Sequence, residues 1–196
     1  MARTSNVSRE TLIESFAEVF RRHGFEGASM SALSKETGLQ KASLYHRFPG
    51  GKEEMAGAVL AYIDEVIERN IITPLHDPAL PPEKKAGILM ESIQKIYNGG
   101  KHSCLLNILS YPTTGKDPFA DTIKKTFQTL NKAISGLLRE CGADADQADE
   151  LANTALMLLQ GSLVLSRGMN STKPFQDAME QIKETIRAVS SKREST

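Results

Sequence analysis

Apolar residues recur at helical spacing along almost the whole chain, and this periodicity limits the possible folds more than any other feature of the sequence. Between residues 52 and 71, for example, Met55, Val59, Tyr62 and Val66 lie on one side of a continuous helix. No stretch alternates between apolar and polar residues for long enough to indicate a strand. We therefore expect an all-α protein of about nine helices.

The first part of the chain is predicted to hold three helices. Ser8 and Ser29 are good N-caps, whereas Gly24 and Gly38 are of the residue type that favours the left-handed end of a helix. These signals, with the Pro49-Gly-Gly break, place helices at about residues 9–23, 30–37 and 41–48. Two short helices joined by a glycine turn have the form of a helix-turn-helix, and we assign residues 1–51 to this three-helix domain.

The remaining residues, 52–196, are predicted to form a larger helical domain that binds a ligand and dimerises. Its first helix covers residues 52–71 and ends before a loop at residues 73–82, which contains four prolines. Apolar periodicity and terminal glycines or prolines indicate further helices at about residues 83–98, 102–111, 118–141, 146–167 and 174–191.

Composition and the absence of motifs exclude several classes of protein. Hydrophobic residues make up 40% of the chain and charged residues 24%, which is ordinary for a globular protein and argues against disorder. The two cysteines, Cys104 and Cys141, lack the spacing of a disulfide framework or a zinc site, and the four histidines are scattered. No catalytic or phosphate-binding motif and no membrane-spanning apolar run occurs. We expect a cytoplasmic protein that is not an enzyme and that binds no metal, cofactor or membrane.

The second helix of the helix-turn-helix carries residues that could read DNA. A recognition helix enters a groove about 12 Å wide, so its outward face needs small and polar side chains. Lys41 and His46 can donate to phosphate or guanine, and Ser43 can bond to either. The Ala42 methyl can approach a thymine methyl, and the Tyr45 hydroxyl suits a phosphate. The alternative is that these are solvated residues on a short surface helix.

The string SMSALSKETGLQKASLYHRFPGGKEEM strongly resembles the DNA-binding domain of the TetR family of repressors, and the resemblance extends from Ser8 to about Ala58. Its specific parts include the Gly38 turn, the Ser43-Leu44-Tyr45-His46 run and the lysine that opens the next helix. The resemblance implies a homodimer in which one helix-turn-helix of each subunit reads double-stranded operator DNA.

The resemblance also assigns roles to individual positions. It implies that Ser29 and Lys52 contact phosphate, which suits their places at helix N-termini. Gln40 departs from the serine or threonine usual in the family, so we expect it to take part in base reading rather than capping. The residues implied to lie in or beside the groove are Lys41, Ala42, Ser43, Tyr45 and His46.

The run FPGGKEE further resembles the LmrA/YxaF-like branch of that family, several members of which respond to drugs or flavonoid-like aromatics. This implies a hydrophobic or aromatic small-molecule inducer, held in a pocket among the helices between residues 52 and 167. The candidate pocket residues are Tyr62, Met90, Tyr97, Cys104, Ile108, Tyr111, Met157 and Gln160. Plain core packing is the commoner role for residues of these types, and a redox role for Cys104 is a further alternative.

The helix expected at residues 146–167 is apolar on nearly all sides and must therefore be covered on all sides. Together with the helix after it, it could bury one face in its own domain and pair the other with a second copy in a four-helix bundle. The candidate interface residues are Ala152, Leu156, Leu159, Leu163, Phe175, Met179, Ile182 and Ile186. The alternative is a monomer whose last two helices complete its own core.

These expectations describe a DNA-binding transcriptional regulator: a repressor that binds a palindromic operator as a dimer and is released by an inducer. An activator of the same fold, a small helical enzyme or carrier, and a pure interaction module are the alternatives. A carrier would show no salt-dependent DNA binding, and for an interaction module the basic residues near Lys41 and Lys52 would be incidental.

Overall fold

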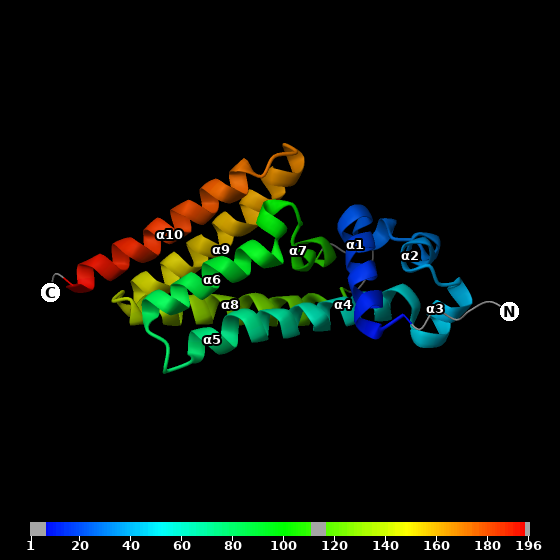
Figure 1. Ribbon diagram of the computed structural model, residues 1–196, viewed down its shortest axis with the longest axis horizontal. Helices are drawn as coiled ribbons and strands as arrows, with labels where there is room; N and C mark the ends of the chain where they lie inside the picture. The colour runs from blue at the N-terminus through cyan, green and yellow to red at the C-terminus, as the bar shows by residue number, and fades with distance from the viewer. Residues whose placement is uncertain (1–6, 111–116, 195–196) are drawn as a thin grey trace. The chain divides into compact units, whose positions relative to one another are not determined.

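The computed structural model describes residues 7–110 and 117–194, and all regular structure in these ranges is helical (Figure 1). None of the helices described is long and apolar enough to cross a membrane. In chain order the elements are α1 (Arg9–Gly27), α2 (Met30–Thr37), α3 (Lys41–Arg47), α4 (Gly51–Ile67), η1 (Glu68–Ile72), α5 (Thr73–His76), α6 (Pro82–Ile96), η2 (Asn98–Gly100), α7 (Leu105–Leu109), α8 (Ala120–Glu140), α9 (Ala145–Gly168) and α10 (Lys173–Glu194).

The described chain divides by its packing into two compact units. We call them the N-terminal unit, which consists of Met1–Asp64 and Leu105–Ile123, and the C-terminal unit, which consists of Glu65–Cys104 and Lys124–Thr196. The N-terminal unit therefore contains most of α4 and all of α7, which packs against α1. The functional division expected at residue 52 is a separate matter and stays a prediction.

The core of the N-terminal unit holds its three helices at fixed places. Phe16 and Phe20 of α1 are fully buried, as are Leu33 of α2 and Leu44 of α3. Burying a side chain of this size contributes about 1.5–3 kcal/mol, so these few residues largely decide how α1, α2 and α3 pack. The start of α1 follows the prediction, because the Ser8 Oγ accepts a hydrogen bond from the Thr11 N–H at 3.1 Å.

The helix after the Pro49-Gly-Gly turn is longer than the sequence predicts. The segments α4, η1 and α5 run without a break, so Pro74 stands inside a helix and only residues 77–81 form the loop. A proline lacks the N–H that would bond to the carbonyl four residues earlier, and its ring crowds that carbonyl. Here the π-helical turn η1 precedes the proline, and the Ser92 hydroxyl donates to the Asn70 carbonyl at 2.8 Å. The expected end at residue 71 was wrong because a contact with α6 replaces the missing bond.

The other helices agree with the prediction to within a few residues, except α7. The helix expected at residues 102–111 is shortened to Leu105–Leu109, and part of that expectation lies outside the described residues. Ten α-helices are described, and α4 and α5 belong to one rod, which leaves nine separate helical segments in the part of the chain described. The expected all-α fold is confirmed.

The C-terminal unit is held together by α9, α10 and α6. Phe175 of α10 is fully buried, with its ring 6.3 Å from that of Tyr97 in an edge-on arrangement. Lys85 of α6 is also buried, and its ammonium donates to both carboxylate oxygens of Glu140, at 2.8 and 2.7 Å. A buried ammonium without a partner would cost several kcal/mol, so this pair fixes the start of α6 against the end of α8.

Candidate nucleic-acid interface

The segment from α2 to α3 has the geometry of a helix-turn-helix. Ser29 caps α2, since its Oγ accepts a hydrogen bond from the Ala32 N–H at 3.1 Å. Gly38 ends α2 in the left-handed conformation, with φ of 69°. The Ser34 hydroxyl then donates to the Leu39 carbonyl at 2.6 Å, which secures the turn. Two helices are thus joined by a short turn that side-chain hydrogen bonds hold in place.

The inner side of α3 is anchored in the core of the N-terminal unit. Leu44 is fully buried, and Phe48 directly after the helix packs edge-on against Phe16, with ring centroids 5.2 Å apart. The Arg9 guanidinium lies over the Phe48 ring, with its carbon 5.3 Å from the centre of the ring. Arg47 donates to the Val7 carbonyl at 2.9 Å. The end of α3 is therefore fixed to the start of α1.

The outer side of α3 carries the residues that the sequence nominated. Tyr45, the largest of them, is 48% exposed, and Ser43 is half-buried. Within the described residues, none of the side chains of Lys41, Ser43, Tyr45 and His46 makes a hydrogen bond or ion pair. The other exposed residues on this side are Gln40, Lys41, Ala42 and His46. The face offers hydrogen-bond donors, positive charge and a methyl group, which suits base edges and phosphates.

Two residues nominated for phosphate differ in how the structure holds them. Ser29 is exposed, and its hydroxyl hydrogen stays available because the oxygen acts as the acceptor in the cap. Lys52 is half-buried: its ammonium lies 4.4 Å from the centre of the Phe25 ring and 3.4 Å from the Glu26 carbonyl oxygen. A phosphate contact by Lys52 would have to share or replace these contacts, and both phosphate roles stay predictions.

Gln40 takes the N-cap position of α3 without capping it. Its side chain makes no hydrogen bond to the helix, and it is exposed. The amide of Gln40 is thus available beside the face formed by Lys41 and Tyr45, and its part in base reading stays a prediction.

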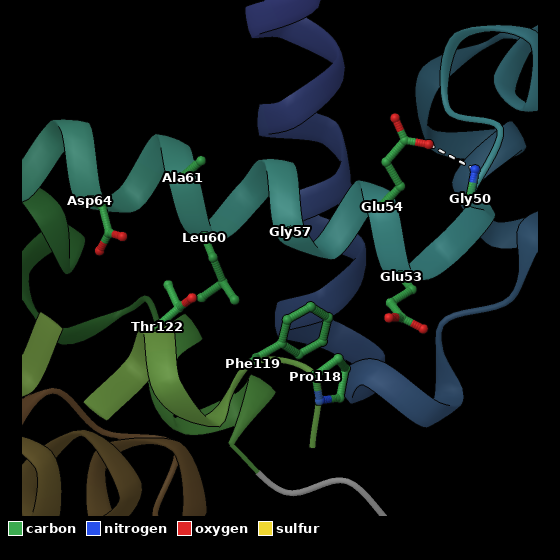
Figure 2. A pocket seen from close by; sticks show the side chains of 10 residues that line it. All are labelled: Gly50, Glu53, Glu54, Gly57, Leu60, Ala61, Asp64, Pro118, Phe119 and Thr122. Carbon is green, nitrogen blue, oxygen red and sulfur yellow. Dashed lines mark hydrogen bonds between the residues drawn. The ribbon is translucent and has the colours of Figure 1, made fainter. Parts of the chain in front are cut away.

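A groove of about 590 Å³ lies elsewhere in the N-terminal unit, between α4 and the turn before α8 (Figure 2). Figure 2 shows Leu60 and Phe119 facing each other across it, with Glu53 and Glu54 nearer the start of α4. One carboxylate oxygen of Glu54 accepts a hydrogen bond from the Gly50 N–H at 2.7 Å. Three acids and no base line the groove, so its charge is opposite to that of the α3 face and it does not suit a polyanion.

The candidate pocket residues are spread over both compact units. Tyr62 and Ile108 belong to the N-terminal unit, and five others belong to the C-terminal unit. Cys104 is buried and accepts a weak hydrogen bond from the Tyr97 hydroxyl at 3.6 Å. Half-buried positions are taken by Tyr62, Met90, Tyr97, Ile108 and Gln160. Tyr111 lies outside the described residues and stays untested, whereas Met157 is 60% exposed and does not fit an enclosed pocket.

Gln160 has one feature that the sequence did not reveal. Its amide oxygen is buried and has no hydrogen-bond partner among the described residues.

No group of three potential metal ligands comes together in the described ranges, 7–110 and 117–194.

The residues proposed for a dimer interface are occupied inside their own subunit. Leu156 is half-buried, and the other seven are buried: Ala152, Leu159, Leu163, Phe175, Met179, Ile182 and Ile186. The prediction chose the wrong face because α9 is apolar on nearly every side, so its periodicity cannot show which side the fold covers. Those seven side chains leave little surface for a partner.

A different face of α9 is both apolar and exposed. Its four large hydrophobic residues are between 54% and 64% exposed: Met157, Val164, Leu165 and Met169. Gly161 and Gly168 follow the same side of the helix, and a Cβ added at either would meet nothing within 4 Å. We call these six residues the α9 apolar stripe. The spacing of four, seven and eight residues after Met157 is the signal in the sequence that could have identified it.

A glycine turn between two short helices, with the second helix anchored by Leu44 and polar on its outer side, defines a helix-turn-helix DNA-binding protein. Two family models match separate parts of this chain. Residues 12–59 match the bacterial regulatory proteins of the tetR family, and residues 88–181 match the C-terminal domain of LmrA/YxaF-like transcriptional regulators. The chain belongs to the TetR family of DNA-binding transcriptional regulators, and its C-terminal part is of the LmrA/YxaF-like type.

Individual relatives agree with this assignment over most of their length. YxaF of Bacillus subtilis, an uncharacterized HTH-type transcriptional regulator, is 24% identical over 182 residues, which cover 92% of this chain and 95% of YxaF. LmrA of the same organism is 25% identical over 170 residues, 86% of this chain and 90% of LmrA. The fold is also that of a cysteine mutant of the TetR-family regulator CifR, solved with 26-bp operator DNA, with a TM-score of 0.70, 22% identity and coverage of 95% and 99% of the two chains. These relatives are transcriptional regulators rather than enzymes.

Proposed function

We propose that this protein is a cytoplasmic repressor that binds a palindromic operator as a homodimer and is released by a small-molecule inducer. The observation that carries the proposal is the outer side of α3, where Lys41, Tyr45 and His46 are exposed and have no partners among the described residues. Because Leu44 and Phe48 hold the helix from behind, these side chains are presented on a rigid support. CifR, whose fold is similar, was solved with operator DNA, which supports operator binding by this chain.

The α9 apolar stripe supports the homodimer. Four large hydrophobic residues, each more than half exposed on one side of one helix, form a surface that a stable protein in water normally covers. A second copy of the same helix offers the same surface, so the contact can be isologous, with each stripe facing the other across a twofold axis. Gly161 and Gly168 leave room for the two helices to approach closely. We therefore replace the eight residues first nominated with this stripe.

The dimer gives the proposed repressor its geometry. Two recognition helices that read successive major grooves must lie one turn of DNA apart, about 34–36 Å, or a multiple of it. An inducer that binds better to a conformation with another separation weakens operator binding by the ratio of its affinities for the two states. We propose a hydrophobic or aromatic inducer, and the candidate residues of the C-terminal unit for holding it are Met90, Tyr97, Cys104 and Gln160.

Selection of duplex DNA from a random pool with the purified protein tests this proposal. We expect enrichment of a palindrome, two chains bound to each duplex, and affinity that falls steeply with salt because much of the contact is to phosphate. A promoter that carries this palindrome then decides between repression and activation in a reporter assay. The proposal fails if no sequence is enriched, or if the enriched duplex binds one chain without any palindrome.

A further inference from the structure

Gly51, the first residue of α4, lies beside the ring of Tyr45 from α3. A Cβ built on Gly51 would lie 3.3 Å from Cε1 of Tyr45, a separation shorter than ordinary carbon contacts in proteins. The position of Gly51 is itself fixed, since its N–H donates to the Phe48 carbonyl at 2.9 Å. The Tyr45 ring therefore lies beside bare backbone that a hydrogen bond holds in place, and the residue as a whole is 48% exposed.

The closeness of Gly51 to Tyr45 and the backbone conformation of Gly51 are two independent reasons for a glycine at this position. Its φ of 64° is in the left-handed region, which already favours glycine. Gly24 and Gly38 have nearly the same φ, 68° and 69°, but a Cβ added at either would meet nothing within 4 Å. Of these three glycines in the N-terminal unit, Gly51 is thus the one at which a side chain would also displace a neighbouring residue.

The neighbour in question is a residue nominated to contact DNA. The Tyr45 hydroxyl has no partner in the part of the chain described, so nothing but ring packing and rotamer preference holds it in direction. We propose that Gly51 is a positioning residue for DNA binding: its bare Cα is the support that sets the direction of the Tyr45 ring and hydroxyl. The proposal rests on the proposed role of Tyr45 at the operator and adds a residue that touches no DNA itself.

A double-mutant cycle between Gly51 and Tyr45 tests the proposal, with the operator selected by the wild-type protein as the probe. In the presence of Tyr45, Gly51→Ala should weaken operator binding about fivefold, the effect of losing one well-placed hydrogen bond. In a Tyr45→Ala background the same change should cost less than about twofold, because no ring remains to be displaced. Gly57→Ala is the control within α4, since its added Cβ meets nothing within 4 Å.

A second variant separates the contact from backbone strain. Gly51→Asn keeps a Cβ but tolerates a left-handed φ better than alanine does. It should unfold at a temperature closer to the wild type than Gly51→Ala and still lose about fivefold in operator affinity. Gly38→Ala introduces strain without a ring contact, so it should lower the unfolding temperature and show no coupling to Tyr45→Ala.

The outcomes separate the positioning role of Gly51 from the proposed contact of Tyr45 with DNA. If Gly51→Ala weakens binding equally in both backgrounds, Gly51 acts through the start of α4 alone and the positioning role is wrong, while the role of Tyr45 stands. If Tyr45→Ala alone leaves operator affinity unchanged, the proposed contact of Tyr45 with DNA is wrong, and the positioning role falls with it.

Discussion

The exposed face of α3 and the exposed stripe of α9 both lack a partner among the residues that the structure describes, but their chemistry is opposite. On α3 the exposed side chains can donate hydrogen bonds, as Tyr45 can, and Lys41 also carries a positive charge. On α9 they are aliphatic or thioether groups, as in Leu165 and Met157. Water solvates the first surface well, whereas the second exposes apolar area that burial would stabilise by about 25 cal/mol per Å².

This difference indicates two kinds of partner. A polar surface on a rigid helix can wait in solvent and bind a charged partner reversibly, in a salt-dependent manner. Covering an apolar stripe permanently stabilises the protein, which favours a second copy of the chain over a transient partner. Each of the following substitutions changes one of the two surfaces, or a contact between supporting helices, and leaves the other surface intact.

The largest effect is expected from a charge within the α9 apolar stripe. Leu165→Glu would place a carboxylate and its symmetry mate in the proposed interface, so we expect the dimer dissociation constant to rise by more than about 100-fold. Sedimentation velocity would show monomers, and operator affinity would fall with the loss of the dimer. Gln128→Glu, on an exposed position of α8, is the control and should remain dimeric. A Leu165→Glu protein that is still a tight dimer would place the interface elsewhere.

The scaffold behind the α9 stripe can be weakened without changing either surface. Glu140→Gln leaves the buried Lys85 ammonium without its counter-charge, and we expect a loss of about 2 kcal/mol in the free energy of unfolding. This is below the usual range for a buried pair because Glu140 is 42% exposed. Glu91→Gln removes the partner of the exposed Lys95 and should cost less than about 0.5 kcal/mol. Urea unfolding measures both, and equal losses would contradict this account of the pair.

Removing one charge from the α3 face should change the salt dependence of DNA binding. For Lys41→Ala we expect the slope of log affinity against log salt to become about one unit shallower, with the fold unchanged. Lys124→Ala, which removes an exposed charge from α8, should leave the slope as it is. Fluorescence anisotropy on the selected operator at several salt concentrations gives both slopes. An unchanged slope for Lys41→Ala would mean that Lys41 meets no phosphate.

The smallest effect concerns the junction of α8 and α9. The Ser135 hydroxyl donates to Asp149, and with the nearby Arg139 it holds the pKa of that carboxyl below its ordinary value. A lowered pKa stabilises the fold at pH values above the unfolded-state pKa, and the contribution is lost as the pH falls through the folded-state value. The stability difference between wild type and Asp149→Asn should therefore be constant from pH 8 to about pH 5 and shrink only in stronger acid. A difference that shrinks already near neutral pH would contradict this.

Local signals explain how much of this structure could be predicted. The start of α1 and both ends of α2 follow from Ser8, Ser29 and Gly38, whose caps and φ values depend on neighbours in the sequence. The continuous helix through Pro74 could not be predicted. The Asn70 carbonyl, which Pro74 cannot bond, instead accepts a hydrogen bond from Ser92 on another helix. The sequence could name candidates on α9, but which side the fold covers depends on how α10 packs against it, so the exposed stripe could not be predicted.

In the candidate DNA-binding face, too, local features could be predicted and contacts between helices could not. That Lys41, Tyr45 and His46 share the outer side of α3 follows from helical periodicity once Leu44 is recognised as the anchor. The packing of Lys52 on Phe25 and of Tyr45 on Gly51 could not be predicted, since both depend on how separate helices meet.

The central claim is that the outer side of α3 enters duplex DNA, and photo-crosslinking tests it most directly. A photoreactive phenylalanine analogue at His46, in full-length protein bound to the selected operator, should form covalent adducts with bases in both half-sites. The same analogue at Gln128 should form none. If the protein with the analogue at position 46 still binds the operator but yields no adduct, α3 does not lie in the groove and the account is wrong.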